Sequence, residues 1–489
     1  MQRIPTALLA SLVAASCTQC GAAVEVPDDD AGPPVELTLT GPAKRLCSGL
    51  WVSQRPDQEE ILYNSVLWTE QQVHDYERGL LTFDVDETRR LVTARFEGAE
   101  GRARHFGDQG CVILPDYTDD VYFAPREVTS ALPAADATPW PMGDVTPSDP
   151  LPADVDGARL DQAVETLFEH EDDNRAAFVV VHRGRIIAER YGPGVHAGMQ
   201  LESWSMGKSV TATLIGVLEQ RGLIGLNDPA PVPLWQSTPD DPRAAIRVAD
   251  LLRMSSGLRF TFTDDPPEVL AGSFVPGQAD HRLAYVAPIN AFDFVTTREL
   301  EFPPNTVGRY RNCDPLTLGS IIRDLVERDL GEEYLTWPQR ALFDEIGIRR
   351  FTLETDPYGN FLLTGYNFGT ARDWARLGLL YLQRGVWAGE RLLSEEFIEL
   401  VSSPAPTWPK GDYGGLFWLN SQGRIRSLPT DAYNAAGAGD QATYIIPSRE
   451  LVIVVMSHRS PAAAAQGRRG REIEALGLTV QAVDPSWTW

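Results

Sequence analysis

Lysine is scarce in this 489-residue chain, which contains only Lys44, Lys208 and Lys410. The 43 basic residues are outnumbered by 68 acidic residues, so the formal net charge is −25. Proteins bind nucleic acid and anionic membrane surfaces through basic patches, so this charge argues against both partners. The acidic composition is explained more simply by solubility.

Recognisable metal and phosphate motifs are also missing. The seven histidines never form a His-Glu-x-x-His arrangement, and no cysteine spacing suggests zinc. A Gly-x-Ser-x-Gly elbow is absent too. The segment 206–209 resembles the end of a phosphate-binding loop, but Glu202 stands where that loop needs a glycine. We therefore expect neither a metal nor another cofactor.

Long apolar runs are absent after the first residues, although a membrane-spanning helix needs about 20 apolar residues. Residues 1–23 are typical of an export signal. Within them, residues 14–17 resemble a bacterial lipobox with Cys17 as the lipidated residue, and cleavage near Ala22 is the alternative. Both alternatives predict an exported protein of the periplasm or cell envelope, which would touch the membrane only through such a lipid.

Differences in amino-acid composition divide the region before residue 159 into three segments after the export signal. Residues 24–35 are acidic and proline-rich, which predicts a spacer. From 36 to 128, short β-type stretches, beginning with 35–40, alternate with turn residues and predict a small β-rich domain. Residues 129–158 contain six prolines and are expected to form a linker.

The chain has five cysteines. In an exported protein, Cys47 and Cys111 are natural disulfide partners and would close the N-terminal domain. Cys313 is expected to be a buried thiol.

Residues 159–489 predict a mixed α/β (α+β) domain. A helical pattern over 160–170 precedes a β-hairpin over 177–188, and a second hairpin over 442–456 follows a mostly helical stretch. Hairpins near both ends of the domain suggest one antiparallel sheet flanked by helices, with a helical subdomain beside it.

Ser205 and Lys208 open a helical pattern, and their spacing places both side chains on one face. A serine hydroxyl needs a base to become a nucleophile, and a desolvated neutral amine can be that base. The alternative is an ordinary exposed lysine on a helix.

Such a site also needs a second proton carrier and donors for an oxyanion. Tyr310, two residues before Asn312, can be this second proton carrier, because a nearby ammonium lowers the pKa of a phenol. The segment from Gly437 to Gln441 is glycine-rich, so its backbone amides can face a ligand. Simple packing of Tyr310 and an ordinary tight turn are the alternatives.

In this order, the three pieces resemble the serine β-lactamase and penicillin-binding-protein-like hydrolases. The resemblance is closest to the class C-like branch that includes family VIII carboxylesterases and 6-aminohexanoate-dimer hydrolase. It extends over about 160–460 and includes the segments 251–258, 370–376 and 444–452. It implies a β-lactamase/transpeptidase-like fold.

The resemblance also implies roles for individual residues. Ser205 would be the nucleophile, Lys208 its base and Tyr310 the proton shuttle. Asn312 would bind Lys208 or a substrate amide. The backbone amides of Ser205 and Ala438 would form the oxyanion hole. The first base, lysine or tyrosinate, is left open.

One departure concerns the substrate. Relatives that act on β-lactams carry Lys-Thr-Gly where this chain has residues 435–437, Ala-Ala-Gly. The missing charge-assisted contact typically contributes about 1.5–3 kcal/mol. The sequence therefore favours an esterase or amidase with a small-molecule substrate. The alternatives are a non-catalytic penicillin-binding-like envelope lipoprotein and a weak β-lactamase or D-peptidase. The sequence does not give the oligomeric state.

Overall fold

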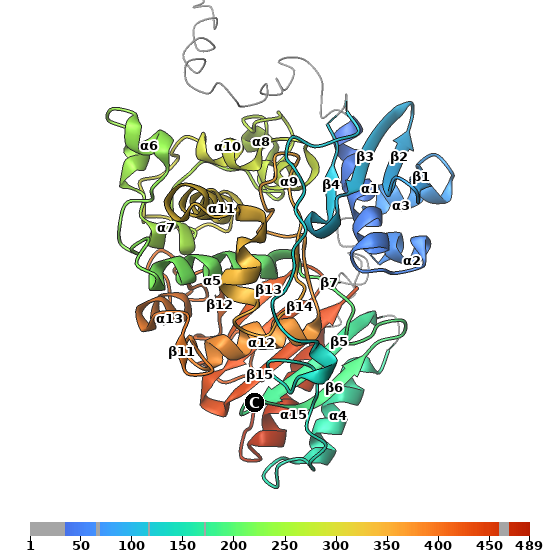
Figure 1. Cartoon of the computed structure of the whole chain (residues 1–489), viewed down its shortest axis with the longest axis vertical. Coiled ribbons are helices and arrows are strands. Elements are labelled where there is room, and N and C mark those ends of the chain that lie inside the picture. Colours follow the sequence, from blue (N-terminus) through green and yellow to red (C-terminus); the bar gives the residue numbers. More distant parts are fainter. Residues whose placement is uncertain (1–34, 65–68, 116–117, 171–172, 459–468) are drawn as a thin grey trace, which may run out of the picture. The chain divides into compact units, whose positions relative to one another are not determined.

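A six-stranded antiparallel sheet lies at the centre of this computed structural model, which describes residues 35–64, 69–115, 118–170, 173–458 and 469–489. The strand order is β12-β13-β14-β15-β5-β6. β15 pairs with β5, so strands from both ends of the region after residue 159 meet in the sheet, as predicted (Figure 1). The strands are β5 Arg175–His182, β6 Arg185–Tyr191, β12 Trp418–Leu419, β13 Tyr433–Gly437, β14 Gln441–Ile446 and β15 Leu451–Ser457.

Alternate side chains of each strand enter two different cores, because successive residues point to opposite faces. In β5, Phe178 and Val180 pack in the core beneath α4 (Gly157–Phe168) and α15 (Arg469–Val483). Val179 and Val181 enter the larger core shared with α5 (Gly207–Gln220) and α12 (Ala371–Leu382). Helices therefore cover both faces of the sheet, which confirms the predicted fold class.

Short helices form a separate group beside the sheet, between β7 and β9 in the chain (Figure 1). The longest of them, α11, packs on α5 and so joins this group to the helix that follows the candidate nucleophile. These helices are α6 Pro233–Ser237, α7 Val248–Leu252, α8 Pro267–Leu270, α9 Asp280–Val286, α10 Ala291–Thr296 and α11 Cys313–Asp324. The remaining elements after residue 200 are β7 Leu201–Glu202, β8 Thr352–Leu353, β9 Asn367–Gly369, β10 Val386–Trp387, β11 Glu390–Arg391 and α13 Glu395–Ser402.

The N-terminal region combines three helices with a four-stranded antiparallel sheet of the order β1-β2-β3-β4. Its strands are β1 Thr82–Asp86, β2 Leu91–Phe96, β3 Ala99–His105 and β4 Cys111–Ile113. The helices of this region are α1 Val35–Trp51, α2 Gln58–Tyr63 and α3 Glu70–Glu77.

The predicted strand over residues 35–40 is wrong, because these residues begin helix α1. Their alternation of apolar and polar residues resembles a strand locally. The longer pattern of Leu39, Ala43, Leu46 and Cys47 instead forms one helical face, which is buried against the small sheet. Tertiary packing therefore overrides the local signal.

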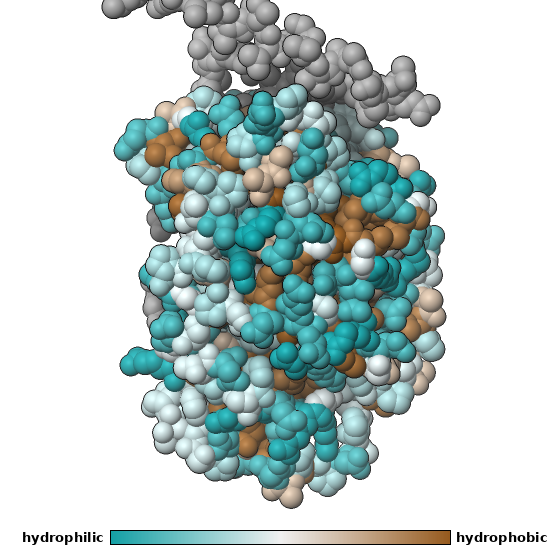
Figure 2. Space-filling model, turned by 90° about the vertical axis from the view of Figure 1, so that its left-hand side faces the viewer, coloured by the Kyte–Doolittle hydropathy of each residue, from teal (hydrophilic) through white to brown (hydrophobic). Residues whose placement is uncertain are grey.

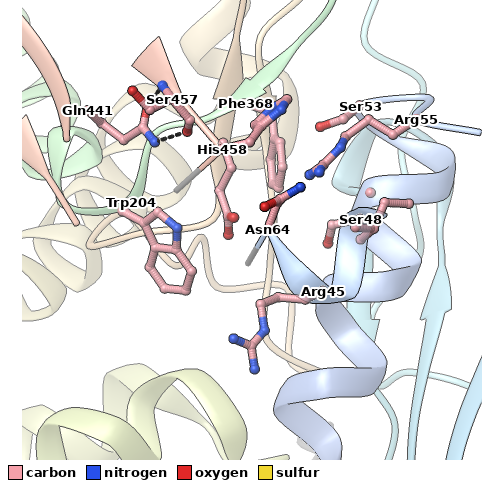
Figure 3. A pocket seen from close by; sticks show the side chains of 13 residues that line it. Arg45, Ser48, Ser53, Arg55, Asn64, Trp204, Phe368, Gln441, Ser457 and His458 are labelled. Atoms are coloured by element: carbon pink, nitrogen blue, oxygen red, sulfur yellow. Dashed lines mark hydrogen bonds between the residues drawn. The ribbon is translucent and has the colours of Figure 1, made fainter. Parts of the chain in front are cut away.

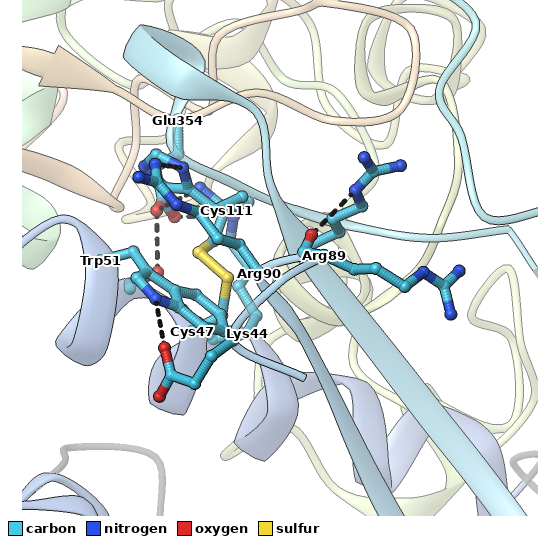
Figure 4. Close-up of a disulfide and its surroundings, with 11 residues drawn as sticks. Lys44, Cys47, Trp51, Arg89, Arg90, Cys111 and Glu354 are labelled. Atoms are coloured by element: carbon cyan, nitrogen blue, oxygen red, sulfur yellow. Dashed lines mark hydrogen bonds and ion pairs between the residues drawn. A yellow bond between two sulfur atoms is a disulfide. The ribbon is translucent and has the colours of Figure 1, made fainter. Parts of the chain in front are cut away.

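The predicted pairing of Cys47 with Cys111 is present as a disulfide that joins α1 to β4 (Figure 4). Beside it, the Lys44 ammonium lies 2.7 Å from Glu354 Oε2, and both side chains are fully buried. Glu354 also accepts hydrogen bonds from Ser48 Oγ (2.7 Å) and from the backbone N–H of Cys111 (2.8 Å). The N-terminal region is thus bound to the segment that follows β8.

The predicted linker, residues 129–158, is attached to the domain that follows it through contacts of the Trp140 side chain. The Trp140 indole N–H donates to the Gly184 carbonyl at 2.8 Å, and the Arg376 guanidinium lies 4.7 Å from the centre of its ring. This part of the chain is therefore attached to the β5–β6 turn and to α12.

The predicted export signal (1–23), the spacer up to residue 34 and Cys17 lie outside the described residues. Among the helices that the structure describes, none combines the length and apolarity needed to cross a membrane. The face shown in Figure 2 is mainly hydrophilic and carries separate apolar patches, as the charge of −25 leads one to expect.

Candidate active site

Ser205 and Lys208 lie in direct contact at the beginning of α5. Ser205 belongs to a short 3-10 turn, Trp204–Met206, and Lys208 is the second residue of α5. The Lys208 Nζ is 2.9 Å from the Ser205 Oγ. The spacing in the sequence therefore becomes a hydrogen-bonded pair, with the serine half-buried and the lysine 1% exposed.

The turn that carries Ser205 has an unusual backbone. Trp204 has a φ of +48°, in the left-handed region that a bulky residue rarely adopts. Its indole packs against Tyr366 at 5.3 Å and Tyr285 at 6.1 Å between ring centres. Gly207 is required by its surroundings, because a Cβ there would lie 1.6 Å from Asn367 Nδ2. Aromatic packing and this close approach hold the serine in place.

Burial lowers the pKa of the Lys208 ammonium well below its ordinary value. Among the described residues, no acidic side chain lies within 4.0 Å of it to offset this effect. Its other hydrogen bond runs to the Thr364 carbonyl at 2.9 Å, which also accepts from the Tyr285 hydroxyl at 2.7 Å. The lysine is therefore suited to be a neutral amine that accepts the serine proton.

Tyr310 lies against the same pair, with its ring centre 5.0 Å from Lys208 Nζ. Trp418 stacks on this ring at 5.6 Å, and Tyr413 meets it edge-on at 6.2 Å. Burial raises the pKa of the phenol, and a hydrogen bond with Ser205 offsets only part of that rise. The expectation that lysine would lower the pKa of Tyr310 is therefore wrong, because the effect of burial dominates.

Asn312 is buried next to this group, but its predicted hydrogen bond to Lys208 is not formed. Its Nδ2 donates to the His281 carbonyl at 3.1 Å, and its Oδ1 has no partner among the described residues. Contact with a substrate amide remains a prediction.

The glycine-rich edge lies directly against the nucleophile turn. A Cβ on Gly437 would be 2.1 Å from the Ser203 carbonyl oxygen and 3.1 Å from the Ser205 nitrogen. Ala438 follows at the exposed end of β13. The two backbone amides assigned to an oxyanion hole therefore belong to adjoining segments.

Gln441 begins β14 and uses its side chain within the sheet. Its Nε2 donates to the Ser457 carbonyl, and its Oε1 accepts from the Ser457 N–H at 3.1 Å. These bonds occupy the amide with the neighbouring strand, so a direct contact of this side chain with substrate has no support in the geometry.

Several residues around the pair were not found from the sequence. Thr364, Tyr285, Trp418 and Tyr413 come from segments far from Ser205 in the chain and carry no motif of their own. Only the three-dimensional packing brings them together. Among the described residues, no group of three or more His, Cys, Asp or Glu side chains is arranged to hold a metal ion.

Comparison with known proteins supports one family. The model of the family described as Beta-lactamase matches residues 160–477. The chain is 26% identical over 333 residues to 6-aminohexanoate-dimer hydrolase of Paenarthrobacter ureafaciens, covering 64% of this chain and 79% of that protein.

Solved structures show the same fold. A Bacillus anthracis protein assigned as a 6-aminohexanoate-dimer hydrolase aligns with a TM-score of 0.52 and 19% identity, over 85% of this chain and 96% of its own. A Bacteroides dorei protein assigned as a β-lactamase aligns with a TM-score of 0.50 and 16% identity, over 68% of this chain and 97% of its own. The chain belongs to the beta-lactamase family and is a serine hydrolase of that fold.

Proposed function

We propose that this protein hydrolyses small esters or amides through an acyl-enzyme formed on Ser205. The observation that carries the proposal is the 2.9 Å contact between Ser205 Oγ and a buried Lys208. A neutral amine at this distance can take the serine proton as the hydroxyl oxygen attacks the substrate carbonyl carbon.

The remaining steps use groups that adjoin this pair. The carbonyl oxygen gains negative charge, and the backbone N–H groups of Ser205 and Ala438 would stabilise it. Tyr310, protonated because of its raised pKa, would give its proton to the leaving oxygen or nitrogen and receive the proton held by Lys208. The C–O or C–N bond then breaks, which leaves the acyl group on Ser205 and the lysine neutral again.

Deacylation would follow the same path in reverse. Water attacks the ester carbon and loses its proton to Lys208 through Tyr310. The Ser205 oxygen leaves and takes that proton back, and the acid product departs.

The substrate class follows from β13. Ala435 and Ala436 provide no cation for a substrate carboxylate, and aromatic rings adjoin Tyr310 instead. An apolar or planar ester or amide needs no such cation. We infer this class from the side chains present.

Export is part of the proposal. The Cys47–Cys111 disulfide supports it, because disulfides persist in oxidising compartments and are rare in the cytosol. Mass spectrometry of the mature N-terminus in a bacterial host would distinguish a lipidated Cys17 from cleavage near Ala22.

Hydrolysis of p-nitrophenyl butyrate tests the central claim. We expect Ser205→Ala to lose nearly all activity, whereas Ser209→Ala, one turn along α5 and with its hydroxyl donating to the Leu416 carbonyl, retains most of it. A fluorophosphonate should label the wild type on Ser205 and leave Ser205→Ala unlabelled. Equal rates for wild type and Ser205→Ala would remove Ser205 from the nucleophile role and favour a non-catalytic binding protein.

A further inference from the structure

A small cavity separates helix α1 from the turn that carries the nucleophile. Side chains of α1 and the residues after it, including Arg45 and Arg55, face Trp204 and His458 across this space (Figure 3). Glu202, three residues before Ser205, also lines it. The cavity therefore lies between the N-terminal region and the hydrolase core.

Arg45 is the unusual member of this lining. Its side chain is 4% exposed, and its Nη1 has no hydrogen-bond partner among the described residues. The salt bridges of the described part of the chain include none to Arg45, whereas Arg55 is paired with Glu60. Within the described part of the chain, its side chain donates a hydrogen bond from Nε to the Gly41 carbonyl at 3.3 Å. An isolated buried guanidinium costs several kcal/mol unless a negative group approaches it.

Glu202 acts on this charge but does not lie within salt-bridge distance of it. Burial raises the pKa of Glu202 to about 8, although the positive charge of Arg45 opposes this rise. Its Oε1 is buried and has no partner among the described residues. Burial lowers the pKa of Arg45; Tyr366 and Glu202 oppose this, whereas Arg282 of α9 adds positive charge.

Further donors line the cavity. Ser53 and Trp204 also line it and are 4% and 3% exposed. Together with Arg45, these groups supply N–H and O–H donors and one positive charge. Such a set complements an anion and leaves a cation without ligands.

The size of the cavity limits what can enter. The space open to the centre of a water molecule is about 20 Å³, and about 10–15 Å³ suffices for one water. One monatomic ion fits.

We propose that this cavity binds one monovalent anion of the size of chloride, held by the Arg45 guanidinium beneath the nucleophile turn. The ion would neutralise the buried charge and join α1 to Trp204, the residue before Ser205. The site is separate from the catalytic groups, so the proposal does not rest on the proposed function.

The test compares halide with a bulky anion at equal ionic strength. Thermal unfolding of the full-length protein is measured in sodium chloride, sodium bromide and sodium gluconate. We expect a saturable rise in Tm of about 1–3 °C in chloride and bromide over gluconate, because a ligand that binds only the folded state stabilises it. A crystal grown in bromide should show an anomalous peak within hydrogen-bond distance of Arg45.

Arg45→Gln should remove the halide dependence. Arg298→Gln is the matched control and should keep it, because Arg298 is also partly buried and has no acidic side chain within 4.0 Å among the described residues, but lies over the rings of Phe274 and Phe294. If Arg45→Gln does not fold, the bromide peak in the wild type decides alone. The same Tm in all three salts, or a water in place of bromide at Arg45, overturns the proposal.

Discussion

Lys44 and Lys208 are two of only three lysines in the chain, and both are almost fully buried, at 0% and 1% exposed. Each ammonium lies near a tyrosine ring, Lys44 at 4.5 Å from Tyr366 and Lys208 at 5.0 Å from Tyr310. Their surroundings differ in one respect: Lys44 has Glu354 at 2.7 Å, whereas Lys208 has a hydroxyl and a carbonyl.

That difference separates a structural lysine from a reactive one. Glu354 favours the charged form of Lys44 and partly offsets the lowering of its pKa by burial. For Lys208, burial acts without an opposing carboxylate, so its pKa falls well below the ordinary value. Burial alone therefore does not make a lysine a base; burial without a counter-ion does.

The largest expected effect comes from Lys208→Met. We expect kcat/KM for p-nitrophenyl butyrate to fall about 10²–10⁴-fold, the usual contribution of a general base. Because no carboxylate is left unpaired, Tm at pH 7 should stay equal to that of the wild type or rise. A marked loss of Tm together with activity would make Lys208 a structural lysine like Lys44.

Lys44→Met should have the opposite profile. Removing one member of a buried pair leaves Glu354 without its partner and costs about 3–5 kcal/mol of unfolding free energy. Denaturant unfolding of Lys44→Met measures this cost, and Lys44→Met combined with Glu354→Leu should recover part of it. Activity per folded molecule should fall much less than in Lys208→Met; an equal fall would show that the comparison is wrong.

The smallest expected effect is in the pH dependence of kcat/KM, which distinguishes Lys208 from tyrosinate as the first base. Lys208 is active when neutral, so the rate should rise as pH increases through its lowered pKa and stay level above it. Tyr310, with its raised pKa, should remain protonated across that plateau. A rate that keeps rising steeply into alkaline pH would instead identify tyrosinate as the first base, and Tyr310→Phe would abolish that rise.

Short sequence patterns are sufficient to predict those elements whose structure depends on neighbouring residues in the chain. The hairpin of β5 and β6, the helix α4 and the capping box at Thr370 all follow from short-range periodicity or turn chemistry. The Ser205–Lys208 contact also follows from spacing along one turn. These features need no knowledge of distant segments.

Other features depend on contacts that the sequence does not reveal. Residues 35–40 have the local pattern of a strand, and the apolar face of α1 to which they belong is recognised only from its packing on β3. The Thr364 carbonyl is separated from Lys208 by 156 positions, and the raised pKa of Tyr310 depends on a burial that no motif encodes. The chemistry of the site was predictable in kind, and the choice of base was not.

The place of Ala435 in β13 has a consequence for the evolution of this enzyme. Its side chain is 3% exposed and lines a small apolar space with Val210 and Thr213 of α5. A lysine acquired there by a single substitution would bury an ammonium against these residues, at a cost of several kcal/mol from a total stability of about 5–15 kcal/mol. A lysine at that position therefore calls for compensating changes in the residues around this space, which belong to α5, α12 and β14.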